Sequence, residues 1–230
     1  MNKDNILFAI VGLLLGLIIG FIGANSINRN AISQANQGVN PLSGLPEGHP
    51  GVTGQADPSS MPEVQSAVEK AKQEPENFEA QVKAGELFYQ IQRYDEAVNY
   101  FAQANKLKPD DRELIVRLGN ASFDGSKFEE AEKWYLKALE TDSEDVNVRT
   151  DLGLTFIFRV PPDYDRAIKE FLASLERNPT HPQTLQNLVV AYTKKGDAAK
   201  ATETLAKLEA VDSQNQAIAR LREEIQKMPK

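Results

Sequence analysis

Apolar residues recur at helical spacing along the chain between residues 78 and 213. Ala97, Phe101 and Ala104 are separated by four and three residues, and Pro109 follows them. This spacing places the three apolar side chains on one face of a helix. The same four positions return after 34, 36 and 34 residues, as Ala131, Tyr135, Ala138 and Ser143, then Ala167, Phe171, Ser174 and Pro179, then Ala201, Leu205, Leu208 and Ser213. A period near 34 residues predicts an all-α fold, an α-solenoid of stacked helix pairs.

A second set of recurring positions predicts the first helix of each pair. Gly85, Gly119 and Gly153 recur at intervals of 34 residues. Two antiparallel helices approach closely only where side chains are small, so these glycines are expected where the two helices of a pair meet. The large residues at positions 101, 135, 171 and 205 are expected to fill the space between one pair and the next. Because no pair can bury its own apolar face, the pairs must stack.

These residues resemble the tetratricopeptide repeat family, in four consecutive repeats at residues 78–111, 112–145, 146–181 and 182–213. The resemblance implies a right-handed solenoid whose inner wall is lined by the first helices. The chain departs from the family pattern in the fourth repeat, where Val189 replaces the glycine, and in the third, which has two extra residues in the turn 159–164. The family's large aromatic residue near the start of the first helix is replaced by Gln81, Ile115, Arg149 and Leu185.

A single helix is predicted on each side of the four repeats. Ser60 and Pro62 have the residue types of an N-cap and a first helical turn, so a capping helix is expected over residues 62–73. Residues 214–228 are amphipathic, with Ile218, Leu221 and Ile225 on one face. Solenoids need such polar-backed terminal helices for solubility.

An apolar segment near the N-terminus predicts a membrane anchor. After a flank at residues 1–5, residues 6–27 contain no charged side chain, and about 20 apolar residues span the hydrocarbon core of a bilayer as a helix. A cleaved signal peptide is the alternative, but its apolar region is usually about 7–15 residues long. Its candidate cleavage site would end at Ala24, with the bulky Ile22 where a small residue is preferred. We therefore favour a retained single-pass anchor.

The charges that flank this segment indicate its orientation. Lys3 precedes it, partly offset by Asp4, whereas Arg29 follows it and the next basic residue is Lys70. The positive-inside rule then favours a cytoplasmic N-terminus, which in a bacterium places the repeats in the periplasm and the anchor in the inner membrane.

Glycines spaced by four residues lie on one face of the predicted anchor: Gly12, Gly16 and Gly20. Such a groove lets two membrane helices approach closely, so the stripe favours a homodimer or docking onto a membrane partner. The alternative is that glycine is simply common in membrane helices.

Residues 28–61 are rich in Gly, Pro, Ser, Asn and Gln and carry little charge, which predicts a flexible linker. A coil of this length would hold the repeats roughly 30 Å from the membrane. His49 lies within it as a possible metal ligand or part of a recognised peptide, but a lone histidine is a poor metal site and the spacer interpretation is favoured.

Composition excludes several classes of function. The formal net charge is −7, which argues against nucleic acid as the main partner, because phosphate binding needs a basic face. The chain has no cysteine, and its two histidines, His49 and His181, lie in the linker and in a turn. Phosphate-binding loops, zinc-protease motifs and nucleophile elbows are missing from the sequence. We therefore expect a protein that is not an enzyme and that uses no cofactor or metal.

By family resemblance, the surface of the first helices is the candidate site for a partner's helix or extended peptide. Its positions on successive repeats are Val82, Glu86 and Tyr89; Val116, Asn120 and Phe123; Thr150, Leu154 and Ile157; Gln186, Val190 and Thr193. The alternative is that the column of Tyr89, Phe123 and Ile157 packs between neighbouring first helices.

One known family mode does not fit this surface. Some relatives grip a C-terminal carboxylate with lysine, arginine and asparagine side chains. Val82, Glu86 and Asp151 stand at positions where that clamp needs a basic residue or an asparagine, and Asn120 alone matches. A clamp needs converging positive charge, so the sequence excludes it.

Three functions remain open. The first is a membrane-tethered scaffold or adaptor that binds a protein or peptide partner in its groove. The second, suggested by the order of anchor, spacer and repeats, is a tetratricopeptide assembly factor of cytochrome c maturation that presents apocytochrome. The third is a structural membrane component that oligomerises through Gly12, Gly16 and Gly20.

Overall fold

The computed structural model describes residues 61–229, which lie in one compact unit of the chain and form ten α-helices without a strand. The helices are α2 (Pro62–Gln73), α3 (Phe78–Gln90), α4 (Tyr94–Leu107), α5 (Arg112–Asp124), α6 (Phe128–Thr141), α7 (Val146–Phe158), α8 (Tyr164–Arg177), α9 (Pro182–Lys195), α10 (Ala198–Val211) and α11 (Ile218–Gln226). All ten are connected by short turns, as expected for stacked antiparallel pairs.

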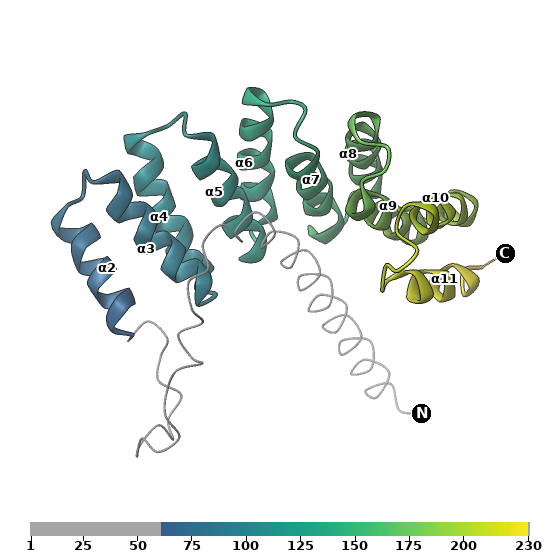
Figure 1. Ribbon diagram of the computed structural model, residues 1–230, viewed down its shortest axis with the longest axis horizontal. Helices are drawn as coiled ribbons and strands as arrows, with labels where there is room; N and C mark the ends of the chain where they lie inside the picture. The colour runs from purple at the N-terminus through teal and green to yellow at the C-terminus, as the bar shows by residue number, and fades with distance from the viewer. Residues whose placement is uncertain (1–60, 230) are drawn as a thin grey trace, which may run out of the picture. The chain divides into compact units, whose positions relative to one another are not determined.

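Each helix packs against its neighbours in sequence, so that the helices of this unit follow one another in a single row (Figure 1). Helices α3, α5, α7 and α9 are the first helices of the four pairs, and α4, α6, α8 and α10 are the second helices. Helix α7 also contacts α9 directly, past α8. Within the described residues the prediction of an α-solenoid is therefore confirmed.

The close approach of the two helices in a pair depends on glycine. A Cβ atom added at Gly85 would lie 2.5 Å from the ring of Phe101, and one at Gly119 would lie 2.6 Å from the ring of Tyr135. Gly153 is covered in the same way by Phe171. Each of these rings therefore lies on the glycine of its own pair, and Phe101 is also buried in one cluster with Leu114 and Leu118 of the next pair, as the sequence predicts.

The fourth pair reaches the same packing with different residues. Val189 stands at the glycine position, and Leu205 stands at the ring position. Both side chains are buried in one cluster with Leu185 and Leu208. A larger side chain on the first helix is thus balanced by a smaller one on the second helix, which explains how this repeat tolerates the loss of its glycine.

The first helices of three repeats begin with the same polar cap. Asn77, Asp111 and Asp145 accept hydrogen bonds from backbone N–H groups three residues further on, at 3.0, 2.9 and 2.9 Å. The fourth repeat has His181 at this position, where its side chain makes no cap hydrogen bond. These caps satisfy N–H groups that a helix cannot satisfy internally and define where each repeat begins.

In three of the turns that precede a first helix, a backbone carbonyl accepts a hydrogen bond from a side chain, and the donor differs from turn to turn. Gln81 donates to Pro75 O at 3.4 Å and to Ala71 O at 2.7 Å, and Arg149 donates to Ser143 O at 2.9 Å. In the turn between them, Lys137 donates to Pro109 O at 2.8 Å. Gln81 and Arg149 occupy positions where the family carries an aromatic residue, so these two departures have a structural role at the turns.

The terminal helices cover the apolar ends of the row. Val64 and Ala71 of α2 are buried, and so are Ile218 and Leu221 of α11. The sequence predicts Ser60 as the N-cap of α2; residue 60 lies outside the described residues, and the N-cap is Met61, which makes no side-chain cap bond. Because proline is at the start of this helix, one N–H group that would need a cap is already missing.

The predicted N-terminal flank, membrane anchor with its glycine stripe, and linker up to residue 60 lie outside the described residues. Between residues 61 and 229, no helix has the length and apolar character needed to cross a bilayer.

Candidate functional site

Nine of the predicted surface positions retain partial exposure, and we call them the first-helix surface. They are Val82, Glu86 and Tyr89 on α3, Val116 and Asn120 on α5, Ile157 on α7, and Gln186, Val190 and Thr193 on α9. Three other predicted positions, Phe123, Thr150 and Leu154, are only 7%, 4% and 1% exposed. These three side chains offer almost no area to a partner, so they are removed from the candidate site.

Phe123 is buried by an aromatic cluster that joins the second and third repeats. Its ring lies edge-on to Phe128 of α6 at 5.5 Å between centroids and to Phe158 of α7 at 5.8 Å. The rings of Phe128 and Phe158 stack at 6.2 Å. The alternative interpretation, in which this column packs between neighbouring first helices, therefore holds for Phe123.

Thr150 is buried where its hydroxyl group makes hydrogen bonds. Its hydroxyl donates to Val146 O at 2.7 Å and lies 2.6 Å from the hydroxyl of Thr184 on α9. This contact joins the third repeat to the fourth. It buries the Thr150 side chain, which the sequence predicts at the surface.

The polar members of the first-helix surface are bonded across repeats. Arg117 of α5 pairs with Glu86 of α3 and with Glu113 one turn before it, the latter at 2.6 Å. Burial alone would lower the pKa of Arg117, but hydrogen bonds and charges of Glu113 and Glu86 outweigh burial and raise it. Tyr89 donates a hydrogen bond to Asp124. These bonds tie α3 to α5 and hold their side chains in place.

Asn120 is partly occupied within its own repeat. Its carbonyl Oδ1 accepts a hydrogen bond from the Tyr135 hydroxyl at 2.9 Å. This bond orients the amide group, whose Nδ2 is the end that could donate to a partner. The one residue that matches the carboxylate clamp of other relatives is therefore oriented by this chain's own tyrosine.

The ion-paired trio of Glu86, Glu113 and Arg117 on α3 and α5 carries a net negative charge. Glu86 and Glu113 share the single guanidinium of Arg117, which leaves one carboxylate charge uncompensated within the trio. Val82 and Val116 occupy the same register position on α3 and α5 and are half-buried. Apolar contact area next to an uncompensated carboxylate suits a segment that carries apolar and basic side chains.

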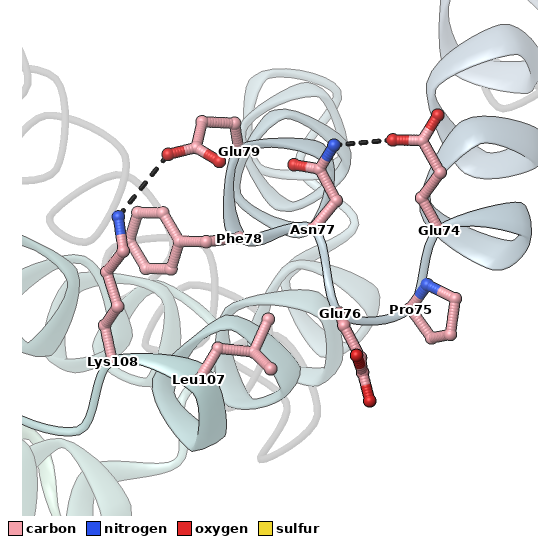
Figure 2. Close-up of a pocket in the computed structure, with 8 residues that line it drawn as sticks. All are labelled: Glu74, Pro75, Glu76, Asn77, Phe78, Glu79, Leu107 and Lys108. Carbon is pink, nitrogen blue, oxygen red and sulfur yellow. Dashed lines mark hydrogen bonds and ion pairs between the residues drawn. The ribbon is translucent and has the colours of Figure 1, made fainter.

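An open depression of about 870 Å³ lies at the edge of the row, between the α2–α3 turn and the end of α4 (Figure 2). Lys108 Nζ lies 3.8 Å from the centroid of the Phe78 ring and 3.4 Å from Glu79 Oε1. A backbone hydrogen bond and then the bond from Lys108 lower the pKa of Glu79. Lys108 thus occupies the position at which the Phe78 ring and the Glu79 carboxylate would bind a cation.

The inserted turn of the third repeat is anchored at both ends. Arg159 and Arg166 both pair with Glu132 of α6, and Arg166 also lies over the Phe156 ring at 4.0 Å. Val160 between them is 90% exposed. A shallow depression of about 430 Å³ lies beside the turn, lined in part by Arg159 and Lys195. Glu132 therefore fixes the insertion against the second repeat.

His181 is the described histidine, and its surroundings are those of a packed residue. Its Nδ1 lies 2.7 Å from the Thr184 hydroxyl. Burial lowers the pKa of its imidazole, with the charge of Asp151 acting in the opposite direction. No three potential metal ligands come together among residues 61–229. The chemistry of the described surfaces is that of binding through apolar, hydrogen-bonding and charged contacts.

These features define an α-helical repeat protein of the class that serves as a protein-interaction scaffold. The chain belongs to the tetratricopeptide repeat family: two models described as tetratricopeptide repeat match it, one at residues 63–112 and 82–146 and the other at residues 163–225. The resemblance inferred from the sequence is thereby confirmed. No curated protein matches the chain.

Solved structures share the fold at low identity. YrrB, described as a TPR protein with an unusual peptide-binding site, is 21% identical with a TM-score of 0.61, over 70% of this chain and 81% of its own. MamA is 20% identical with a TM-score of 0.59, over 65% and 86%. MamA 41-end from Desulfovibrio magneticus RS-1 is 18% identical with a TM-score of 0.60, over 66% and 85%. At these identities the likeness concerns the fold alone.

Proposed function

We propose that this protein is a membrane-tethered scaffold that binds a protein or peptide partner on the first-helix surface. The observation that carries the proposal is the pair of half-buried valines, Val82 and Val116, at one register position on adjacent first helices. Apolar anchors at regular spacing suit a partner's helix or extended segment. YrrB, which shares the fold, is described as having a peptide-binding site.

The partner segment carries apolar side chains and at least one basic side chain in this proposal. The support is the uncompensated carboxylate that Glu86 and Glu113 leave beside Arg117. Charge complementarity of this kind contributes more to specificity and association rate than to affinity. Binding should therefore weaken as ionic strength rises.

Site-specific photocrosslinking in cells tests the binding surface. A photoreactive amino acid replaces Val116 in one variant and Leu136 of α6 in the control, since Leu136 is 44% exposed on a second helix. We expect a discrete adduct from position 116 that disappears when Val82→Asp is added, and no adduct from position 136. Equal adducts from both positions, or none from position 116, would contradict the proposal.

A charge reversal tests the nature of the partner separately. Glu113→Lys should reduce the adduct from position 116, whereas Glu129→Lys, on an exposed position of α6, should leave it unchanged. If Glu113→Lys has no effect while the adduct persists, the surface binds a partner but the inferred basic group is wrong.

The tether is proposed from the uncharged apolar segment at residues 6–27, with the repeats in the periplasm of a bacterium. The absence of native cysteine makes its topology testable: Ser213, which is exposed, is replaced by cysteine. A membrane-impermeant thiol reagent should label it in cells whose outer membrane alone has been permeabilised. Labelling only after lysis would place the repeats in the cytoplasm and overturn this orientation.

A further inference from the structure

Four polar side chains meet at the joint between the third and fourth repeats, and at three of these positions the first two repeats have apolar residues. Thr150 of α7, Ser174 of α8 and Thr184 of α9 are buried, and His181 at the start of α9 is half-buried beside them. In the first two repeats, the residues equivalent to Ser174 are Ala104 and Ala138, and the residues equivalent to Thr150 and Thr184 are apolar. We call these four side chains the hydroxyl cluster.

The contacts within the hydroxyl cluster form a chain that crosses from α9 to α7. His181 Nδ1 lies 2.7 Å from Thr184 Oγ1, which lies 2.6 Å from Thr150 Oγ1. Thr150 Oγ1 lies 2.7 Å from Val146 O, and Ser174 Oγ lies 3.0 Å from the same carbonyl oxygen. Two longer contacts join Ser174 to Thr150 at 3.1 Å and to Thr184 at 3.3 Å.

Counting hydrogens favours one tautomer of the imidazole. If each of the four shortest contacts contains a hydrogen, the three hydroxyl groups supply one each, and His181 Nδ1 supplies the fourth. The only arrangement that fills all four contacts runs from His181 Nδ1–H to Thr184, from Thr184 to Thr150, and from Thr150 and Ser174 to Val146 O.

Without a hydrogen on Nδ1, Thr184 would have to donate to the histidine and Thr150 to Thr184. Thr150 Oγ1 and Val146 O would then be 2.7 Å apart with no hydrogen between them. Two buried oxygens in that position repel each other, and Ser174 can donate to only one of them, either to Val146 O at 3.0 Å or to Thr150 Oγ1 at 3.1 Å.

We propose that His181 is a positioning residue, which donates a hydrogen bond from Nδ1 to the hydroxyl cluster and so stabilises the packing of α9 against α7. Protonation of its Nε2 in mild acid weakens this packing. The inference concerns the joint and does not rest on the proposed binding function. Protonation leaves the Nδ1 hydrogen bond intact but places a positive charge in a half-buried site at the N-terminus of α9, where the helix dipole disfavours cations.

The groups around the imidazole come from α7 and α9. Asp151 of α7 acts on it with an opposite charge, and α9 contributes Thr184 and its own N-terminus. Ser174 of α8 contacts Thr184 at 3.3 Å. Burial outweighs Asp151, so the pKa of His181 lies below its usual value in the folded protein. The stabilising contribution is therefore complete above the unfolded pKa near 6.5 and is lost as the pH falls through that value towards the folded pKa.

The first test determines the tautomer. The full chain is labelled with ¹⁵N-histidine, and His49→Ala assigns the two histidine signals. At pH 8, two-bond ¹H–¹⁵N correlation spectra should show His181 protonated at Nδ1 and unprotonated at Nε2. An unprotonated Nδ1 would overturn the hydrogen count and, with it, the proposed chain.

The second test measures the joint by amide hydrogen exchange at pH 7.5 and 5.5, corrected for intrinsic rates. Protection of α9 should fall relative to α3, by up to about tenfold for each unit by which folding lowers the pKa of His181. His181→Asn, which can cap the helix as Asn77 does, should abolish this pH dependence. Thr184→Val keeps the imidazole and should lower the protection of α9 already at pH 7.5. A wild-type response equal in α3 and α9 would contradict the proposal.

Discussion

Ser122 stands where the other repeats carry an aromatic ring, at Phe88, Phe156 and Tyr192. Its side chain is fully buried, and its Oγ has no hydrogen-bond partner among residues 61–229. A buried hydroxyl without a partner keeps the desolvation cost and gains nothing in return. This residue is therefore a point at which the chain has not reached its maximal stability.

Ser122→Ala should raise the free energy of unfolding by about 1 kcal/mol, because it removes an unpaired buried hydroxyl and improves helix propensity. Urea unfolding followed by circular dichroism measures the change. The matched control is Ser174→Ala, whose hydroxyl bonds Val146 O, and this variant should be less stable than the wild type. If both alanines shift the urea midpoint in the same direction, the distinction between the two serines is wrong.

At the scale of the element, the two helices of each pair pack through side chains of complementary size. Gly153 meets Phe171 in the third pair, whereas Val189 meets Leu205 in the fourth. Gly153→Val should destabilise the protein by about 1–3 kcal/mol, since the added atoms overlap the Phe171 ring.

Adding Phe171→Leu to Gly153→Val should recover part of that loss by reproducing the fourth pair. Phe171→Leu alone should destabilise, because it leaves a cavity over the glycine. A double-mutant cycle in urea separates the coupling from the single effects. Purely additive effects would show that the ring and the glycine do not compensate each other.

The inserted turn depends on one carboxylate of another element. Glu132 of α6 is largely buried between Arg159 and Arg166, so Glu132→Gln should leave two guanidinium groups without their charged partner. We expect a loss of about 1 kcal/mol and faster proteolytic cleavage after Arg159. Glu129→Gln, on an exposed position of the same helix, serves as the control. Equal cleavage rates in the two variants would show that Glu132 does not anchor the turn.

At the scale of the whole described unit, stability is distributed along a row of helices that contact mainly their neighbours. Leu221 of α11 is fully buried in a cluster with Leu185, Val189 and Leu208. In such an array, a destabilising substitution at one end affects mainly the helices near that end, because repeats interact with their nearest neighbours.

Leu221→Ala should lower the protection of α9 and α10 against hydrogen exchange while α3 and α4 keep theirs. The local loss should be about 2–5 kcal/mol, as for other buried leucines. Ala219→Ser, at an exposed position of α11, is the control. A uniform loss of protection in all helices would indicate that the unit unfolds as a single cooperative body.

The candidate site was only partly predictable, and the reason appears in particular residues. Val82, Glu86 and Val116 keep partial exposure, as their positions on the first helices predict. Phe123 and Thr150 do not, since Phe158 and Thr184 reach them from the following pair. Periodicity indicates which face of a helix a residue occupies but carries no information on a partner more than 30 residues away.

The family, the period, the pairing of helices and the small residues at which they meet could all be predicted from the sequence. These follow from local spacing and side-chain size, which are written directly in the order of residues. The folded structure adds which ring covers which glycine and which carbonyl each turn donor bonds. It also shows that three hydroxyls and one imidazole share a buried joint. Those features depend on distances between separate repeats, and such distances arise only when the helices pack.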